Sequence, residues 1–168
     1  MSTSSHKADA PKQIRAGIIT VSTTRGLTED QSGRWMSKRL VKEGHTVAFH
    51  VVVPDIAEEI EAAVLQAIAE HKPQAILVTG GTGISRQDVT IETVRPMFQK
   101  EMTAFGVLFA QLSFEQVDSA AVLSRATAGI VADTVLFCIP GSLKACKLAC
   151  KALIFPELGH IARHLVVG

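Results

Sequence analysis

Residues 75–92 read AILVTGGTGISRQDVTIE, an apolar run that stops abruptly at a glycine-rich segment. A short apolar run bounded by turn residues predicts a buried strand. A loop that directly follows such a strand lies at its carboxyl end, where open α/β sheets bind ligands. Glycine has no Cβ, so the backbone of residues 80–83 can approach a ligand closely. The sequence therefore predicts a ligand-binding loop at residues 80–88, which we call the glycine-rich loop.

The glycine-rich loop differs from the two common phosphate-binding loops. No Gly-Lys-Ser/Thr follows it, as a Walker loop requires, and Arg86 stands where the dinucleotide fingerprint has its third glycine. A glycine-rich turn after a strand is often only structural. The hydroxyls of Thr79 and Thr82 and the successive backbone N–H groups also suit a phosphate or a polar ring. We expect a phosphorylated small molecule as the ligand.

Strands and helices alternate on the way to this loop. Apolar, β-branched runs predict strands at residues 14–22, 45–53 and 75–79. Apolar residues at helical spacing predict helices at about 33–43 and 56–71. Such alternation indicates a parallel sheet with right-handed crossovers. The carboxyl ends of all three strands would then lie at one edge of the sheet.

Polar residues predict where these helices begin. Ser32 is a candidate N-cap for the first helix. Asp55, with Glu58 three residues later, has the form of a capping box for the second. Asp88 is a competent N-cap for a short helix at about 90–98.

The remaining chain predicts a helix within residues 103–117, two strands and a last helix. The strand-like runs 124–130 and 134–139 are typical of an antiparallel hairpin, which we expect at the edge of the sheet. The turn Pro140-Gly141-Ser142 leads into the last helix. The apolar faces of the two helices comprise Phe105, Leu108, Phe109 and Leu112, and Leu143, Cys146, Cys150, Leu153 and Ile154.

Composition indicates one globular domain. The chain has 168 residues, of which 47% are hydrophobic and 20% charged, and we expect a single domain at 13–168 behind a disordered tail at 1–12. The net charge of +1 argues against a nucleic-acid surface. No apolar stretch reaches membrane-spanning length. Three cysteines without a secretory signal predict reduced thiols and a cytoplasmic protein.

Acidic residues recur on the loops at the predicted edge. Asp30, Asp55 and Asp88 follow the first, second and third strands respectively. Carboxylates alone would repel a polyphosphate, so a divalent cation such as Mg²⁺ would have to mediate. Each of Asp55 and Asp88 also has the simpler explanation of capping a helix.

Other polar residues leave two explanations open. Ser142 is either a plain N-cap or part of an anion site at a helix start. Arg125 lies in an otherwise apolar run and is either a buried ion-pair partner or a phosphate ligand. Cys146 and Cys150 lie one helical turn apart without nearby metal-ligating residues, which favours core packing over a metal site.

Taken together, these motifs resemble one family. The segments VTGGTGISRQDVTIE, LSRATAGI and IPGSLKA, with Val21-Ser22 and Asp30-Gln31-Ser32-Gly33 before them, are similar to the MoaB/Mog family of molybdenum cofactor biosynthesis proteins. The resemblance covers nearly everything from Ile14 to His164. It implies a three-layer α/β/α fold with a mostly parallel sheet, and a homo-oligomer that is a trimer or a hexamer.

The resemblance also implies a reaction. Active members bind molybdopterin and transfer AMP from Mg-ATP to its terminal phosphate. Here Asp88 matches the acid essential for the pterin site, and Asp55 matches the acid assigned to Mg²⁺ and ATP; both are catalytic candidates. The positions that match the rest of the pocket are Gly80, Gly81, Thr82, Gly83, Ser22, Ser124, Gly141 and Ser142.

One departure from the family pattern keeps a second hypothesis open. Adenylyltransferase members often carry Pro-Gly-Asn-Pro or Pro-Gly-Ser-Pro, whereas here Leu143-Lys144 follows Ser142. The first hypothesis is molybdopterin adenylyltransferase. The second is a molybdopterin-binding or carrier protein without turnover, and the third is an oligomeric assembly protein with a vestigial pocket.

Overall fold

The computed structural model describes residues 11–167, so the first ten residues of the predicted tail lie outside it. At its centre is a six-stranded sheet with the order β2-β1-β3-β6-β5-β4. β2, β1, β3 and β6 are parallel, and β5 is antiparallel to both of its neighbours. The strands are β1 (Arg15–Val21), β2 (Thr46–Val53), β3 (Ala75–Thr79), β4 (Lys100–Glu101), β5 (Thr127–Val131) and β6 (Thr134–Ile139).

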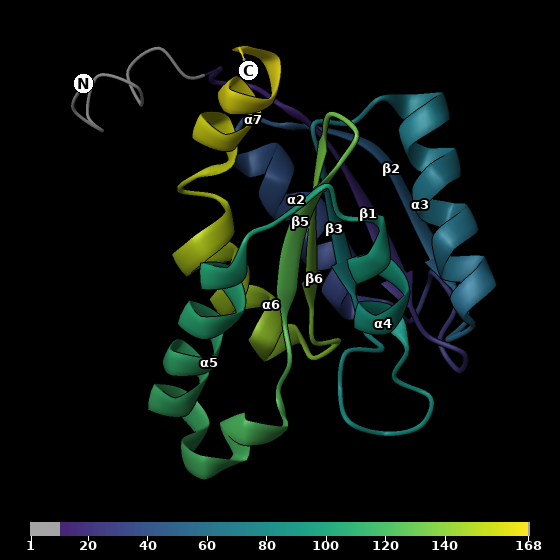
Figure 1. Cartoon of the computed structure of the whole chain (residues 1–168), viewed down its shortest axis with the longest axis vertical. Helices are drawn as coiled ribbons and strands as arrows, with labels where there is room; N and C mark the ends of the chain where they lie inside the picture. The colour runs from purple at the N-terminus through teal and green to yellow at the C-terminus, as the bar shows by residue number, and fades with distance from the viewer. Residues whose placement is uncertain (1–10, 168) are drawn as a thin grey trace.

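Helices cover both faces of the sheet (Figure 1). α2, α5, α6 and α7 pack on one face, and α3 and α4 on the other. This arrangement confirms the predicted three-layer α/β/α fold. The helices are α2 (Gln31–Lys42), α3 (Ala57–His71), α4 (Thr90–Val94), α5 (Thr103–Val117), α6 (Leu143–Ala149) and α7 (Leu158–Val167), joined in places by the short helical turns η1 (Arg95–Met97), η2 (Asp118–Leu123) and η3 (Cys150–Ile154).

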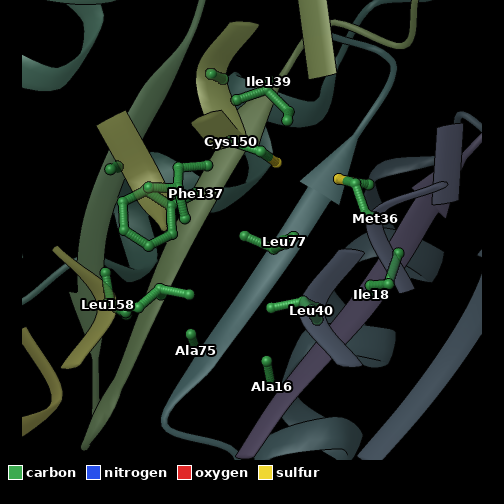
Figure 2. Packing of buried hydrophobic residues seen from close by; sticks show 14 of the residues in the cluster. Ala16, Ile18, Met36, Leu40, Ala75, Leu77, Phe137, Ile139, Cys150 and Leu158 are labelled. Carbon is green, nitrogen blue, oxygen red and sulfur yellow. The ribbon is translucent and has the colours of Figure 1, made fainter. Parts of the chain in front are cut away.

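The central strands β1, β3 and β6 are mostly apolar because both of their faces are buried. Successive side chains of a strand point to opposite faces, so Ile18 of β1 packs towards α2 and Ile19 towards α3. Figure 2 shows Met36 and Leu40 of α2 facing the same side of the sheet as Ile18. Full burial of each such side chain contributes about 1.5–3 kcal/mol. The parallel alignment of the strands therefore rests on a core on either side.

The predicted antiparallel hairpin forms at one side of the sheet, but the prediction missed the short strand β4 that lies beyond it. β6 pairs with β3 inside the sheet, and the two-residue strand β4 lies outside β5. Backbone bonds from Gln99 to Ile130 (2.8 Å) and from Met102 to Ala128 (2.7 Å) hold β4 there. A two-residue strand is too short to show an alternating hydrophobic pattern, so the sequence did not predict β4.

The predicted caps were also wrong in three places. Asp30, not Ser32, caps α2, through a bond from Gly33 N. Ile56 stands at the N-cap of α3 and Val89 at that of α4, neither with a side-chain bond. The predicted helix at 90–98 ends at Val94, because Pro96 has no backbone N–H to donate and the tighter turn η1 takes over at Arg95.

Asp30 is the centre of a buried polar cluster beneath α2. Its carboxylate accepts hydrogen bonds from Thr20 Oγ1 (2.5 Å) and Gly33 N (2.8 Å), and His50 Nε2 lies 2.7 Å from it. A Cβ on Gly33 would overlap both Asp30 Oδ2 and His50 Nε2. The Asp-x-Ser-Gly sequence therefore fixes where α2 begins on the sheet.

We expect Gly33→Ala to destabilise the fold by about 1–3 kcal/mol, because overpacking a full site forces its neighbours apart. The matched control is Gly26→Ala, whose Cβ would meet only the end of the exposed Glu29 side chain, at 3.0 Å. Urea unfolding of both variants measures the free energy. An unchanged Gly33→Ala protein would show that the cluster can relax.

Candidate functional site

The loops that follow β1, β2, β3 and β6 meet at one edge of the sheet and enclose a cleft of about 680 Å³. In Figure 1 this edge is the lower end of the sheet, where the long loop between β3 and α4 hangs. The cleft is lined by all ten residues that the sequence singled out as the site: Ser22, Asp55, Gly80, Gly81, Thr82, Gly83, Asp88, Ser124, Gly141 and Ser142.

The turns after β3 and β6 touch at two glycines. Gly80 has φ of 98°, and a Cβ there would overlap the carbonyl of Val21. A Cβ on Gly141 would lie 3.2 Å from Gly80 Cα. Gly81 also has a positive φ, 63°, which favours glycine. The glycines are needed because neighbouring loops approach the backbone so closely.

Asp55 is held by the first loop and does not cap α3 as predicted. Thr23 N and Thr23 Oγ1 both lie 2.8 Å from Asp55 Oδ2 and donate to it, and Asp55 N donates back to Thr23 Oγ1 at 3.1 Å. A Cβ on Gly81 would lie 3.2 Å from Asp55 Oδ1. No donor within residues 11–167 bonds to this Oδ1. One carboxylate oxygen is therefore fixed, and the other is available beside the glycine-rich loop.

Asp88 closes the glycine-rich loop on itself and does not cap α4. Its Oδ2 accepts from Ser85 N at 2.8 Å, and its own N–H donates to Ser85 O at 3.1 Å. The hydrogen bonding by Ser85 lowers the pKa of Asp88, although partial burial opposes this, and the charge of Arg125 lowers it further. Asp88 is therefore ionised at neutral pH and acts as an acceptor.

Thr82 presents an unsatisfied hydroxyl. The residue is 1% exposed, and within the described part of the chain its Oγ1 has no hydrogen-bond partner. Leaving a buried polar group unpaired costs about 1–3 kcal/mol. Because Thr82 lines the cleft, a bound ligand is the natural partner for this hydroxyl.

The serines of the cleft have local bonds as well. Ser142 Oγ accepts from Ala145 N at 3.2 Å, so it caps α6, as the simpler explanation held. Ser22 Oγ accepts from Arg25 N at 3.2 Å. Ser32, predicted as a cap, instead donates to Gly141 O at 2.9 Å and so ties α2 to the turn after β6.

Arg125 proves to be an ion-pair partner, but its side chain is partly exposed and not buried as predicted. Its guanidinium bonds both carboxylate oxygens of Glu92, at 2.6 and 3.1 Å. It also donates to the glycine-rich loop. Sequence reasoning missed the polar lining residue Thr23 and two charged ones, Arg25 and Glu29. The available signal for Thr23 was its place directly after Ser22, at the carboxyl end of β1.

Comparison with known proteins assigns the chain to a family. Residues 17–160 match the family described as "Probable molybdopterin binding domain". The chain belongs to this family. This match confirms the resemblance that the sequence motifs indicated, and we refer to the chain as a molybdopterin-binding-domain protein.

Relatives of this molybdopterin-binding domain span its whole length. Molybdenum cofactor biosynthesis protein B of Bacillus subtilis is 43% identical over 166 residues, 98% of both chains. Molybdopterin adenylyltransferase of Pyrococcus furiosus is 41% identical over 170 residues, again 98% of both. A crystal structure of molybdenum cofactor biosynthesis protein B matches with a TM-score of 0.91 and 41% identity, over 95% of this chain and 100% of that one.

Asp30 is the one predicted edge acid that the fold of this domain removes from the cleft. It is fully buried beside Thr20 and His50 and does not line the cleft. Burial acts to raise the pKa of Asp30, but the bonds from Thr20, Gly33 N and His50 outweigh it and lower the pKa. Asp30 therefore organises the fold, while Asp55 and Asp88 remain at the site.

The cysteines of the domain are core residues. Burial raises the pKa of Cys138 to about 12 and raises those of Cys146 and Cys150, so the thiols stay protonated.

Residues 11–167 contain no cluster of three or more potential metal-ligating His, Cys, Asp or Glu side chains. Within the same range, no helix combines the length and the apolar character needed to cross a bilayer.

The lowered pKa of Asp30 predicts a pH-dependent contribution to stability. A carboxylate whose pKa is lower when folded stabilises above its unfolded pKa, about 3.9, and loses this as the pH falls through the folded value. We expect Asp30→Asn to cost about 1–3 kcal/mol at pH 7, and the difference from the wild type to narrow below about pH 4.

Urea unfolding between pH 7 and pH 3 measures this difference. The control is Asp133→Asn, at an exposed position in the turn between β5 and β6. A constant difference for Asp30→Asn over this range would contradict the assigned charge of Asp30.

Proposed function

We propose that this protein acts in molybdenum cofactor biosynthesis by binding molybdopterin in the cleft and transferring AMP from ATP to its terminal phosphate. The observation that carries the proposal is the meeting of the glycine-rich loop, Asp55 and Asp88 in one cleft. A volume of about 680 Å³ is in the usual range for a small-molecule site. The family membership and the Pyrococcus furiosus relative, a molybdopterin adenylyltransferase, support the same reaction.

The glycine-rich loop binds the pterin and its phosphate in this proposal. Gly80, Gly81 and Gly83 let the ligand approach the backbone, and Thr82 Oγ1 gains the partner that it lacks. Asp88, ionised at neutral pH, accepts a hydrogen bond from an N–H of the pterin ring. The donor and acceptor needs of the loop and of the ligand thus match.

The nucleotide lies on the other side of the cleft, along Ser22, Ser124 and the Gly141–Ser142 turn. Mg²⁺ suits Asp55 because a hard cation takes carboxylate oxygen together with phosphate oxygens, and Asp55 Oδ1 is the available oxygen there. When bound by Asp55 and the nucleotide, Mg²⁺ would neutralise charge on the pyrophosphate leaving group. Thr23 orients Asp55 for this task.

The chemical step needs no strong base. A terminal phosphate oxygen of molybdopterin attacks the α-phosphorus of ATP, the bond from that phosphorus to the bridging oxygen breaks, and pyrophosphate leaves with the bonding electrons. The attacking oxygen is already ionised at neutral pH. The residues of the chain therefore act by positioning the two substrates and by balancing charge.

The departure at Leu143-Lys144 leaves the turn after β6 intact. Ser142 caps α6 through Ala145 N, so the helix begins without a proline at its first position. The second candidate, a binding or carrier protein without turnover, rests on the same departure. Calorimetric titration with Mg-ATP separates the two, because a pure pterin binder has no nucleotide affinity.

We expect Asp55→Asn and Asp88→Asn each to lower kcat/KM by about 100-fold or more, because each removes fixed charge from the reacting centre. Pyrophosphate release from molybdopterin and Mg-ATP measures the rate. Asp133→Asn, at the opposite end of β6, is the matched control and should turn over normally. Normal turnover by either cleft variant would remove that residue from the mechanism.

We also propose that the protein forms a homo-oligomer, a trimer or a dimer of trimers. An apolar face of α5 and η2 supports it, since α5 carries no charged residue from Thr103 to Phe114. A helix that is apolar all round is normally buried. The exposed large apolar residues of this face are Val107, Leu108, Phe114, Val117, Val122 and Leu123.

We expect Phe114→Asp to shift the wild-type oligomer to monomer, because association would bury a charge in an apolar interface. Light scattering coupled to size exclusion measures the mass. The control is Val41→Asp, at an exposed position on α2, and it should leave the mass unchanged. A monomeric wild type would contradict the oligomer, and an oligomeric Phe114→Asp variant would contradict this interface.

We propose a cytoplasmic location. Cys138, Cys146 and Cys150 are all free and buried. Free thiols are typical of reducing compartments. ATP, the proposed co-substrate, is a cytoplasmic metabolite.

A further inference from the structure

Arg125 contacts two other segments at the wall of the cleft, the glycine-rich loop and α4. It lies in the connection between η2 and β5, directly after Ser124. Its Nε lies 2.9 Å from Thr82 O and 3.0 Å from Gly83 O, in the glycine-rich loop. Its two terminal nitrogens bond Glu92 on α4. One side chain therefore joins the connection between η2 and β5 to both the glycine-rich loop and α4.

The middle of the glycine-rich loop has few other supports. Gly81 O accepts from Thr90 N at 2.9 Å, and Gly80 O accepts from Thr90 Oγ1 at 2.9 Å. Ser85 and Asp88 bond each other at the far end of the loop. Between these anchors, Arg125 binds the carbonyls of Thr82 and Gly83, and Asp88 takes a hydrogen bond from the backbone of Gly83.

Holding a carbonyl also directs the next N–H group. A trans peptide is planar, so its C=O and N–H point in opposite directions. When Arg125 fixes Thr82 O, it fixes the direction of Gly83 N–H as well. The backbone of Gly83 hydrogen-bonds to Asp88 and helps to lower its pKa. Both residues line the cleft, so the orientation of this peptide affects the carboxylate that the proposed function assigns to the ligand.

Glu92 keeps the guanidinium in this orientation. The bidentate pair with Glu92 sets the plane of the Arg125 side chain. Both side chains are partly exposed, 36% for Arg125 and 55% for Glu92. Exposed ion pairs contribute little to stability, so the role of this pair is to orient the Arg125 guanidinium.

We propose that Arg125 is a positioning residue that holds the glycine-rich loop in its ligand-binding shape, with Glu92 orienting Arg125. This inference rests on the proposed function, because the loop is assigned there to molybdopterin. Lysine cannot replace Arg125, since a single ammonium group lacks the planar fork that reaches Glu92 and two carbonyls at once.

The experiment compares Arg125→Lys and Glu92→Gln with the wild type in the full-length protein. Hydrogen exchange of the amides at residues 82–85, without ligand, reports on the loop. Fluorescence titration with molybdopterin reports on binding. The matched controls are Arg39→Lys and Glu43→Gln, because Arg39 and Glu43 form a comparably exposed Arg–Glu pair on α2, outside the cleft.

We expect Arg125→Lys to speed loop exchange about tenfold, as two hydrogen bonds are lost, and to weaken molybdopterin binding about 10- to 100-fold. Glu92→Gln should also speed loop exchange and weaken molybdopterin binding, but to a smaller extent than Arg125→Lys. The control variants should change neither. The thermal unfolding midpoints of the Arg125 and Arg39 variants should shift alike.

Three outcomes would overturn the inference in distinguishable ways. Wild-type exchange in Arg125→Lys would show that Arg125 does not brace the loop. Faster exchange with unchanged affinity would show a purely structural contact. A wild-type protein that binds no molybdopterin would remove the proposed function, and the positioning role with it.

Discussion

Parallel alignment of β2, β1, β3 and β6 is the constraint on which the cleft depends. Their carboxyl ends coincide because the strands run in parallel, with β1, β3 and β6 buried between the helices on both faces and β2 at the edge. Four loops are thereby brought to one edge. Contacts such as that of Ser32 with Gly141, 109 positions apart, then lock the loops together. The site is a consequence of how the core is buried.

Within the cleft, polar groups are only partly satisfied. Asp55 uses one oxygen to bind Thr23 and keeps the other beside Gly81. Thr82 keeps an unpaired hydroxyl in the wall. The surrounding bonds hold these groups in place before any ligand arrives, and such preorganisation lowers the cost of binding. The groups that would bind a ligand are therefore already in position in the folded protein.

Local pattern predicted the elements and their bounds well and the capping side chains poorly. The bounds of β3 and α5 follow directly from apolar runs and turn residues. The capping role predicted for Asp55 failed because Thr23, distant in sequence, competes for its carboxylate. Strand β4 escaped notice because two residues carry no period. Non-local partners and very short elements leave no trace in a sequence pattern.

The sequence by itself determined the parallel strands and the loops that would gather at one edge, because hydrophobic period and glycine placement are local properties. The three-layer class and most of the site positions came from the resemblance of its motifs to a known family. Only the tertiary structure decided which acids remain at that edge. It buried Asp30 under α2 and left Asp55 and Asp88 in the cleft. It also turned Arg125 onto the glycine-rich loop. Those outcomes depend on which distant side chains come within hydrogen-bond reach, and packing alone sets that.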